Sequence, residues 1–309
     1  MTLTELRYIV AVARHRHFGH AAEACFVSQP TLSVGVKKLE EELGQPLFER
    51  RQGEVTVTPF GEQVVAQAQE VLEQVERIRH LAEEEKGALR SPLRLGLIYT
   101  IGPYLTPHLI PELRRIAPQM PLLIREDFTA NLAEALKRGE VDAIVVSLPF
   151  EAPGIEVQPL YDEPFVLALP SDHPLTRRRR IAPQMLAEET VLLLTAGNCF
   201  RDQVVEICPD CLHRGTTDGY LLQALEGSSL ETIRQMVASG VGVTVLPVTS
   251  TGGNRDLEGL LSFREFTRPV PSRRVALAWR RSFPRREAIE ALTEAIGRCR
   301  LEGVRPVKA

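Results

Sequence analysis

The sequence contains no apolar run long enough to cross a membrane. A spanning helix needs about 18 or more consecutive apolar residues, and no stretch of these 309 residues approaches that length. The chain opens with Met1–Glu5, without a basic segment followed by an apolar core, so we expect no secretory signal and a cytoplasmic protein. It also has no internal repeat or low-complexity tract. We therefore expect neither a membrane protein, nor a periplasmic solute-binding protein, nor a repeat architecture.

Neither sign of charge is in clear excess. The net charge is −3, with 25% charged and 44% hydrophobic residues, as in ordinary globular proteins. Overall charge is a poor test for nucleic-acid binding when one small domain binds DNA and a larger one does not. The length is sufficient for two or more domains.

Cysteine is limited to five residues. Without an export signal they are expected to be reduced thiols, so any disulfide among them would be transient. We interpret Cys25 and Cys299 as small buried hydrophobic residues, the usual role of an isolated cysteine. The other three, Cys199, Cys208 and Cys211, lie close together in the sequence.

Residues 1–58 predict a winged helix-turn-helix domain. Thr2 and Glu5 fit a capping box at the start of a first helix, and a short second helix follows around residues 21–24. A third, longer helix follows Ser28 and stops at Gly44. Two short extended pieces then form a hairpin, or wing, at residues 47–50 and 55–58.

Residues 59–88 predict one long linker helix. Its apolar residues recur in a heptad pattern, at Val64, Ala68, Val71, Val75, Ile78 and Ala82. The narrow stripe favours a dimer-forming helix, and the alternative is a helix that packs on its own domain. Gly87 and Ser91–Pro92 mark its end and a hinge.

Residues 92–301 alternate strands with helices, which predicts an α/β fold with βαβ units and a parallel sheet. We expect two subdomains with a cleft between them, subdomain I at about 92–162 and 268–301 and subdomain II at about 163–267. The expected strands lie at 93–98, 122–125, 143–146, 165–169, 191–194, 241–246 and 275–279, and the expected helices at 106–116, 131–138, 230–239 and 284–299.

The third helix is the candidate DNA-reading element. Ser28 suits the N-cap and Pro30 is tolerated in the first turn. The polar residues of its outward face, which a recognition helix presents to the major groove, are Gln29, Thr31, Ser33 and Lys37. Arg50 on the wing is expected to hold a phosphate. The alternative is that these residues are only the solvated face of an amphipathic helix.

The N-terminal motifs resemble the signature of LysR-type transcription regulators. They are Leu6-Arg7-Tyr8, Ala21-Ala22, Val27-Ser28-Gln29-Pro30-Thr31-Leu32-Ser33, Leu39-Glu40-Glu41-Glu42-Leu43-Gly44, Leu47-Phe48-Glu49-Arg50 and Val57-Thr58-Pro59-Phe60-Gly61. The resemblance implies double-stranded DNA as a partner, a dimer through the linker helix, and a periplasmic-binding-protein-like effector domain, assembled as a homotetramer that contacts RNA polymerase. It implies no enzymatic activity, cofactor or metal.

Cys199 is the candidate reactive thiol. Asn198 is a good N-cap, which places Cys199 in the first turn of a helix. There the helix dipole and the nearby Arg201 favour the thiolate, the form that attacks peroxide. If a continuous helix connected Cys199 to Cys208, their sulfurs would lie on opposite faces, roughly 13 Å apart along the axis. A disulfide needs Cα atoms within about 7 Å, so a bond between them would require this segment to be rebuilt.

The segment Gly197-Asn198-Cys199-Phe200-Arg201-Asp202-Gln203 resembles the peroxide sensors of the OxyR type within the LysR family, and their second cysteine is reproduced as Cys208. The resemblance implies that Cys199 senses hydrogen peroxide and that Cys208 resolves the oxidised form. It implies a peroxide pocket built from Thr100, Thr129, Asn198, Asp202 and Arg274. Two departures are Asn198, where these sensors commonly have His, and the additional Cys211, which is an alternative to Cys208 as the resolving partner.

Three alternatives stay open at this stage. The first is a LysR-type regulator that binds a small organic effector in the cleft, with unreactive cysteines. The second is a thiol peroxidase or oxidoreductase, which the reading helix and the linker argue against. The third is a zinc site made by the cysteine cluster and His213, although the spacing lacks the usual paired pattern.

Overall fold

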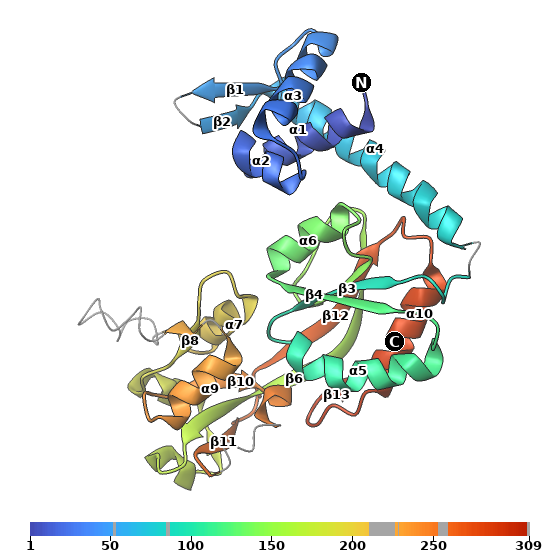
Figure 1. Ribbon diagram of the computed structural model, residues 1–309. Coiled ribbons are helices and arrows are strands. Elements are labelled where there is room, and N and C mark those ends of the chain that lie inside the picture. The colour runs from blue at the N-terminus through green and yellow to red at the C-terminus, as the bar shows by residue number, and fades with distance from the viewer. Residues whose placement is uncertain (52–53, 85–86, 210–225, 228, 253–258, 308–309) are drawn as a thin grey trace. The chain divides into compact units, whose positions relative to one another are not determined.

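The computed structural model describes the chain apart from residues 52–53, 85–86, 210–225, 228, 253–258 and 308–309 (Figure 1). The chain divides into two compact units, residues 1–85 with the short segment 137–139, and residues 86–136 with 140–309. Each unit has its own hydrophobic core. None of the described helices is both long and apolar enough to span a bilayer.

The N-terminal unit is the predicted winged helix-turn-helix. The capping box of Thr2 and Glu5 is formed, and Ser28 Oγ caps the third helix by accepting from the Thr31 N–H. Gly44 ends that helix with φ 72°, a backbone conformation that glycine adopts without strain. The elements are α1 (Leu3–His15), α2 (Phe18–Ala24), α3 (Gln29–Leu43), β1 (Phe48–Arg51), β2 (Glu54–Val57) and α4 (Pro59–Glu84).

Some apolar residues of helix α4 are buried in the N-terminal unit, and others are exposed. Ala68 is buried in the core of the N-terminal unit, and Val64 and Leu72 pack against the same core. Val71 and Ile78, seven residues apart, are 43% and 66% exposed. The first half of the predicted seam therefore packs on its own domain, and two apolar side chains further along stay uncovered within the unit.

The C-terminal unit begins with the predicted βαβ pattern. Strand β3 (Leu93–Ile98) runs parallel to both β4 (Leu122–Asp127) and β5 (Ala143–Ser147). The connecting helices are α5 (Gly102–Ile116) and α6 (Thr129–Lys137). A Cβ at Gly96 would lie 2.7 Å from Leu132 of α6, so glycine permits this helix to approach the sheet closely.

The expected parallel pairing is correct for β3, β4 and β5, but antiparallel strands join the same sheet. Strand β12 (Ser272–Arg280) inserts between β5 and β6 (Ile155–Pro170) and runs antiparallel to both. An alternation of strands and helices does not specify which strands become neighbours, so the returning C-terminal segment is free to take this central place. Both β6 and β12 are long (Figure 1). Residues of β6 contribute to both core clusters of the unit.

The second cluster of the C-terminal unit lies around the end of β6. Strands β10 and β11 pair antiparallel with β6, and β11 pairs parallel with β7. The predicted strands at 191–194 and 241–246 are shorter in the structure, because only parts of these segments pair. The remaining elements are β7 (Arg180–Ile181), β8 (Leu193–Leu194), α7 (Cys199–Ile207), β9 (Glu226–Gly227), α9 (Leu230–Ala238), β10 (Thr244–Pro247), β11 (Leu261–Phe266), α10 (Arg286–Arg298), β13 (Arg305–Pro306) and the 3-10 turns η1 (Pro174–Arg177), η2 (Pro183–Glu188) and η5 (Val248–Thr251).

Candidate functional site

Helix α7 separates Cys199 from Cys208. Cys199 is its first residue, as predicted, and Cys208 is the residue that caps its C-terminal end. Asn198 occupies the N-cap position but does not cap with its side chain. Its Nδ2 donates instead to the Thr195 carbonyl, 3.0 Å away, and so closes the preceding turn. The predicted position of Asn198 is therefore correct, whereas the predicted side-chain cap is wrong.

Two adjacent faces of α7 contact different parts of the unit. Phe200, Val204 and Cys208 recur every four residues and are buried in the second core cluster. Cys199 packs against the first cluster. Gln203, four residues after Cys199, donates through Nε2 to Ser147 Oγ at the end of β5, 2.8 Å away. The helix therefore joins the two clusters, with the Cys199 face on the first.

Cys199 lines a small cavity. Thr100, Thr129 and Asn198 share its wall, which also includes Ile98, Tyr99, Asp127, Phe128 and Gly197. Thr100 follows β3 and Thr129 begins α6, so both lie at the carboxyl ends of parallel strands, a common place for ligand sites. The cavity has a volume of about 10 Å³, which is about the space that one water molecule needs.

One polar atom of the cavity wall has no partner among the described residues. Thr129 Oγ1 is buried and makes no hydrogen bond there. A buried hydroxyl without a partner is costly, so such an atom beside a cavity indicates a polar ligand or a water. Of the five residues expected to shape a peroxide pocket, Thr100, Thr129 and Asn198 lie together around Cys199.

Arg273 is a buried cation next to this cavity that the sequence reasoning missed. Its Nη1 donates to Thr100 Oγ1 over 2.7 Å, and its Nη2 donates to the Thr100 carbonyl over 2.8 Å. Its Nε donates to Glu163, which is also buried and accepts from Thr249. The guanidinium carbon lies 5.5 Å from the centroid of the Phe200 ring. Arg273 therefore connects β12, β6, the end of β3 and α7.

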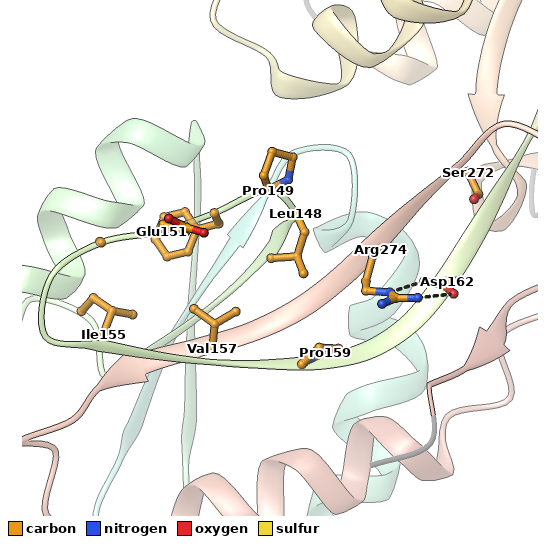
Figure 2. Close-up of a pocket in the computed structure, with 11 residues that line it drawn as sticks. Leu148, Pro149, Glu151, Ile155, Val157, Pro159, Asp162, Ser272 and Arg274 are labelled. Atoms are coloured by element: carbon orange, nitrogen blue, oxygen red, sulfur yellow. Dashed lines mark hydrogen bonds and ion pairs between the residues drawn. The ribbon is translucent and has the colours of Figure 1, made fainter.

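Arg274 and Asp202 do not line the cavity, which corrects two expectations. Arg274 points to the other face of β12, is 48% exposed at its side chain, and forms a bidentate pair with Asp162. Figure 2 shows this pair in the wall of a different, open cavity of about 780 Å³, with Leu148 and Val157. Successive residues of a strand face opposite sides of the sheet. Arg273 and Arg274 are neighbours in β12, so one faces the buried side and the other faces the open cavity. Asp202 lies exposed on α7.

Asp127 places a charged carboxylate in the wall of the cavity. Burial tends to raise the pKa of Asp127, but hydrogen bonds from Asn131 and Arg125 outweigh it and hold the pKa below its ordinary value. This carboxylate is therefore anionic at neutral pH, and it forms an ion pair with Arg125, with 2.9 Å between Asp127 Oδ2 and Arg125 Nη2.

The other cysteines lie in different surroundings. Burial raises the pKa of Cys25 and raises that of Cys299 to about 11, which keeps both protonated. Cys25, Cys199 and Cys299 carry free thiols. Cys208 is buried and belongs to a disulfide, whose partner is therefore not Cys199. Cys211 and His213 lie outside the described residues.

No group of three or more potential metal ligands occurs within the described ranges. The zinc alternative involves Cys211 and His213, which the structure does not describe, so it stays untested.

The predicted DNA-reading residues lie along the start of α3. Gln29, Pro30 and Thr31 are exposed in its first turn, and Ser28 Oγ lies 2.8 Å from Thr31 Oγ1. Ser33 is half-buried, and Lys37 is exposed, 3.6 Å from Glu41. Arg50 belongs to β1, and its side chain lies outside the described part of the chain.

Comparison with known proteins decides the family. Residues 3–62 match "Bacterial regulatory helix-turn-helix protein, lysR family", and residues 86–299 match "LysR substrate binding domain". The chain belongs to the LysR family. The predictions of a winged helix-turn-helix domain and of a LysR-type effector domain are thereby confirmed.

Similar proteins of this family include OxyR proteins. The chain is 39% identical over 303 residues to "DNA-binding transcriptional dual regulator OxyR" of Escherichia coli K12, with 98% of this chain and 97% of that one covered. It is 54% identical to a full-length Pseudomonas aeruginosa OxyR with a Cys-to-Asp substitution, with a TM-score of 0.71 and 97% and 99% covered. A Corynebacterium glutamicum OxyR cysteine variant, described as H2O2-bound, is 33% identical, with a TM-score of 0.59 and 96% and 92% covered.

Proposed function

We propose that this chain is a DNA-binding transcription regulator of the LysR family that senses hydrogen peroxide at Cys199. The observation that carries the proposal is the small cavity whose wall includes Cys199, which has a free thiol, together with Thr100 and Thr129, whose buried hydroxyl has no partner among the described residues. Space for about one water molecule suits a ligand of two oxygen atoms, after a slight widening, and excludes an organic effector at this position. The H2O2-bound relative supports the same assignment.

The first chemical step is attack of the Cys199 thiolate on one peroxide oxygen. A sulfur–oxygen bond forms, the oxygen–oxygen bond breaks, and the leaving hydroxide takes a proton to become water. The product is Cys199 sulfenic acid. The Thr100 and Thr129 hydroxyls hold the peroxide oxygens, and Arg273 orients Thr100 through its hydrogen bond to Oγ1. We assign no role in this step to Arg274 or Asp202.

The second step joins Cys199 to Cys208. The Cys208 thiol attacks the sulfenic sulfur, a disulfide forms, and water leaves. Cys208 must be a thiol for this step, so the disulfide in which it participates here must first be reduced by a cellular thiol. The two cysteines lie at opposite ends of α7, so α7 must unwind, and at least one of them must leave the core cluster that it contacts. Oxidation is thus a conformational switch.

The conformational switch acts through the DNA-binding domain. We propose that α3 enters the major groove through Gln29, Thr31, Ser33 and Lys37, with Ser28 and Pro30 shaping its start and Arg50 on a phosphate. We infer a dimer through α4, a homotetramer of the full chain, contact with RNA polymerase at activated promoters, and a cytoplasmic location, where the DNA is. Peroxide is consumed as a signal rather than turned over, so the chain is not an enzyme and needs no cofactor.

Mass spectrometry of the cysteines after a limiting dose of peroxide tests this function. In the reduced wild type, Cys199 should be oxidised first and then found joined to Cys208. Cys208→Ser should retain a sulfenic acid at Cys199, and Cys199→Ser should show no modification. Cys299→Ser is the matched control and should behave like the wild type.

Two other outcomes are informative. A bridge from Cys199 to Cys211 would transfer the resolving role to Cys211 and keep the sensor. An unmodified Cys199, with transcription responding to a small metabolite instead, would contradict peroxide sensing and leave a LysR-type regulator with an organic effector.

A further inference from the structure

Phe26 is almost wholly exposed at the turn between α2 and α3. Its exposed fraction is 96%, the largest of any large hydrophobic residue that the structure describes. Isolated exposed apolar residues are common on protein surfaces, so exposure alone indicates nothing. The backbone of Phe26 supplies a second observation.

Phe26 occupies a backbone position that favours glycine. Its N–H donates to the Glu23 carbonyl over 3.0 Å, and the Val27 N–H donates to the Ala22 carbonyl over 3.0 Å. This pair of bonds is the Schellman motif that ends a helix, with Phe26 in the left-handed position and φ 56°. Glycine is preferred there because a Cβ is strained at positive φ. Arg16 is the other described non-glycine residue with positive φ.

Phenylalanine is therefore unfavourable at this position for two reasons, the positive φ and the exposure of the ring to water. A glycine would relieve the backbone, and a polar side chain would suit the exposure to water. No described residue of the unit covers the ring, which is absent from the core cluster that contains its neighbours Cys25 and Val27. A residue that conflicts with local structure at two levels is expected where function requires it.

We propose that Phe26 is an apolar DNA contact, whose ring packs against deoxyribose and thymine-methyl surface beside the reading helix. It stands two residues before Ser28, the N-cap of α3, and the first-turn residues Gln29 and Thr31 are exposed next to it in the sequence. The N-terminal end of such a helix is the part that meets the bases. The thymine methyl is the apolar group of the major groove, so an aromatic ring at this turn adds a contact that polar residues cannot make.

This inference rests on the proposed DNA-binding function. The test uses the full-length protein and a DNA duplex selected by the wild type from a random-sequence library. Phe26→Ala should weaken binding about tenfold, the size of one apolar or stacking contact. Phe26→Tyr keeps the ring and should bind nearly as well as the wild type. Phe26→Gly should also bind weakly, yet melt at a higher temperature, because it removes the strain at positive φ.

The salt dependence distinguishes the kind of contact. Each phosphate contact adds to the slope of log K against log salt concentration, so loss of a neutral ring should leave that slope unchanged, whereas Lys37→Ala should reduce it if Lys37 binds a phosphate. A reduced slope in Phe26→Ala would overturn the apolar contact. Equal affinity of wild type, Phe26→Ala and Phe26→Gly overturns it too, and lost transcription with unchanged DNA affinity would assign Phe26 to a protein partner instead. A wild type that binds no DNA would overturn the proposed function as well.

Discussion

Arg273 donates a hydrogen bond to Thr100 Oγ1 over 2.7 Å and so links strand β12 to the wall of the cavity that contains Cys199. Because Thr100 accepts this bond, its own hydroxyl proton is left to donate to another oxygen. A peroxide oxygen in the cavity is a suitable acceptor. The same guanidinium is neutralised by Glu163, so its place is determined by a buried ion pair.

Replacement of Arg273 by Met should slow the oxidation of Cys199 and destabilise the fold. Glu163 would be left as a buried, unpaired charge, which costs about 3–5 kcal/mol. Stopped-flow peroxide kinetics and urea unfolding measure the two effects. Arg274→Met is the control, because Arg274 is half-exposed and lies outside the cavity. Slower oxidation in Arg274→Met than in Arg273→Met would contradict this assignment.

The double variant Arg273→Met/Glu163→Leu separates reactivity from stability. It removes both charges of the buried pair, so stability should largely return, as it often does when apolar residues replace a buried ion pair. The oxidation of Cys199 should stay slow, since Thr100 is still unsupported. Recovery of the wild-type rate would mean that Arg273 matters only for the fold.

Replacement of Ser147 by Ala should speed disulfide formation without changing the rate of the first oxidation. The variant removes the hydrogen bond of Gln203 Nε2, whose amide oxygen already has no partner among the described residues, with a cost of about 1–3 kcal/mol to the folded helix α7. Unwinding should then be faster by about fivefold or more. Quenched-flow mass spectrometry resolves the sulfenic acid from the disulfide. Ser250→Ala, another buried serine, is the control, and an equal effect of Ser250→Ala would mean that general loosening is responsible.

Charged substitutions at Val71 and Ile78 should dissociate the dimer. Both side chains are exposed on α4 within the N-terminal unit, so Val71→Asp/Ile78→Asp leaves its core intact. Leu72→Asp is the matched comparison and should unfold that unit instead, because Leu72 packs against its core. Sedimentation and circular dichroism distinguish the two results. An unchanged oligomer in the folded Val71→Asp/Ile78→Asp variant would mean that subunits associate elsewhere.

Loss of the Gln29 and Thr31 side chains should reduce operator affinity, by about tenfold or more for one good base contact. The Ser28 cap on the Thr31 N–H is retained in Gln29→Ala/Thr31→Ala, so α3 should stay folded. Gln45→Ala, beyond the other end of α3, is the control. Footprinting that cannot distinguish the double variant from the wild type would argue against α3 as the reading helix.

Acid should weaken the N-terminal unit through Glu5. The hydrogen bond from Lys38, 3.0 Å away, lowers the pKa of Glu5 below its ordinary value. A lowered folded-state pKa contributes stability that is present above the unfolded value and is lost as the pH falls through the folded value. Glu5→Gln should therefore be less stable than the wild type at pH 7, with the difference vanishing towards pH 3. A constant difference in melting temperature across this range would assign the effect to packing.

Local features of this protein were predictable from the sequence. The caps at Thr2 and Ser28, the start of α7 at Cys199 and strand β3 depend on interactions between residues a few positions apart, which the sequence displays directly. The placement of Thr100, Thr129 and Asn198 around Cys199 followed the resemblance to known sensors.

Only the tertiary structure decided which arginine reaches the cavity. Side chains alternate across a strand, so Arg273 and Arg274 differ in the face they occupy, and the face depends on how β12 inserts between β5 and β6. The same holds for Ser147 and Gln203, which are 56 residues apart and meet only when α7 docks on the end of β5. Likewise, the periodicity of the apolar residues in α4 does not indicate which of them pack on their own domain. Burial depends on what packs against the helix, not on its periodicity.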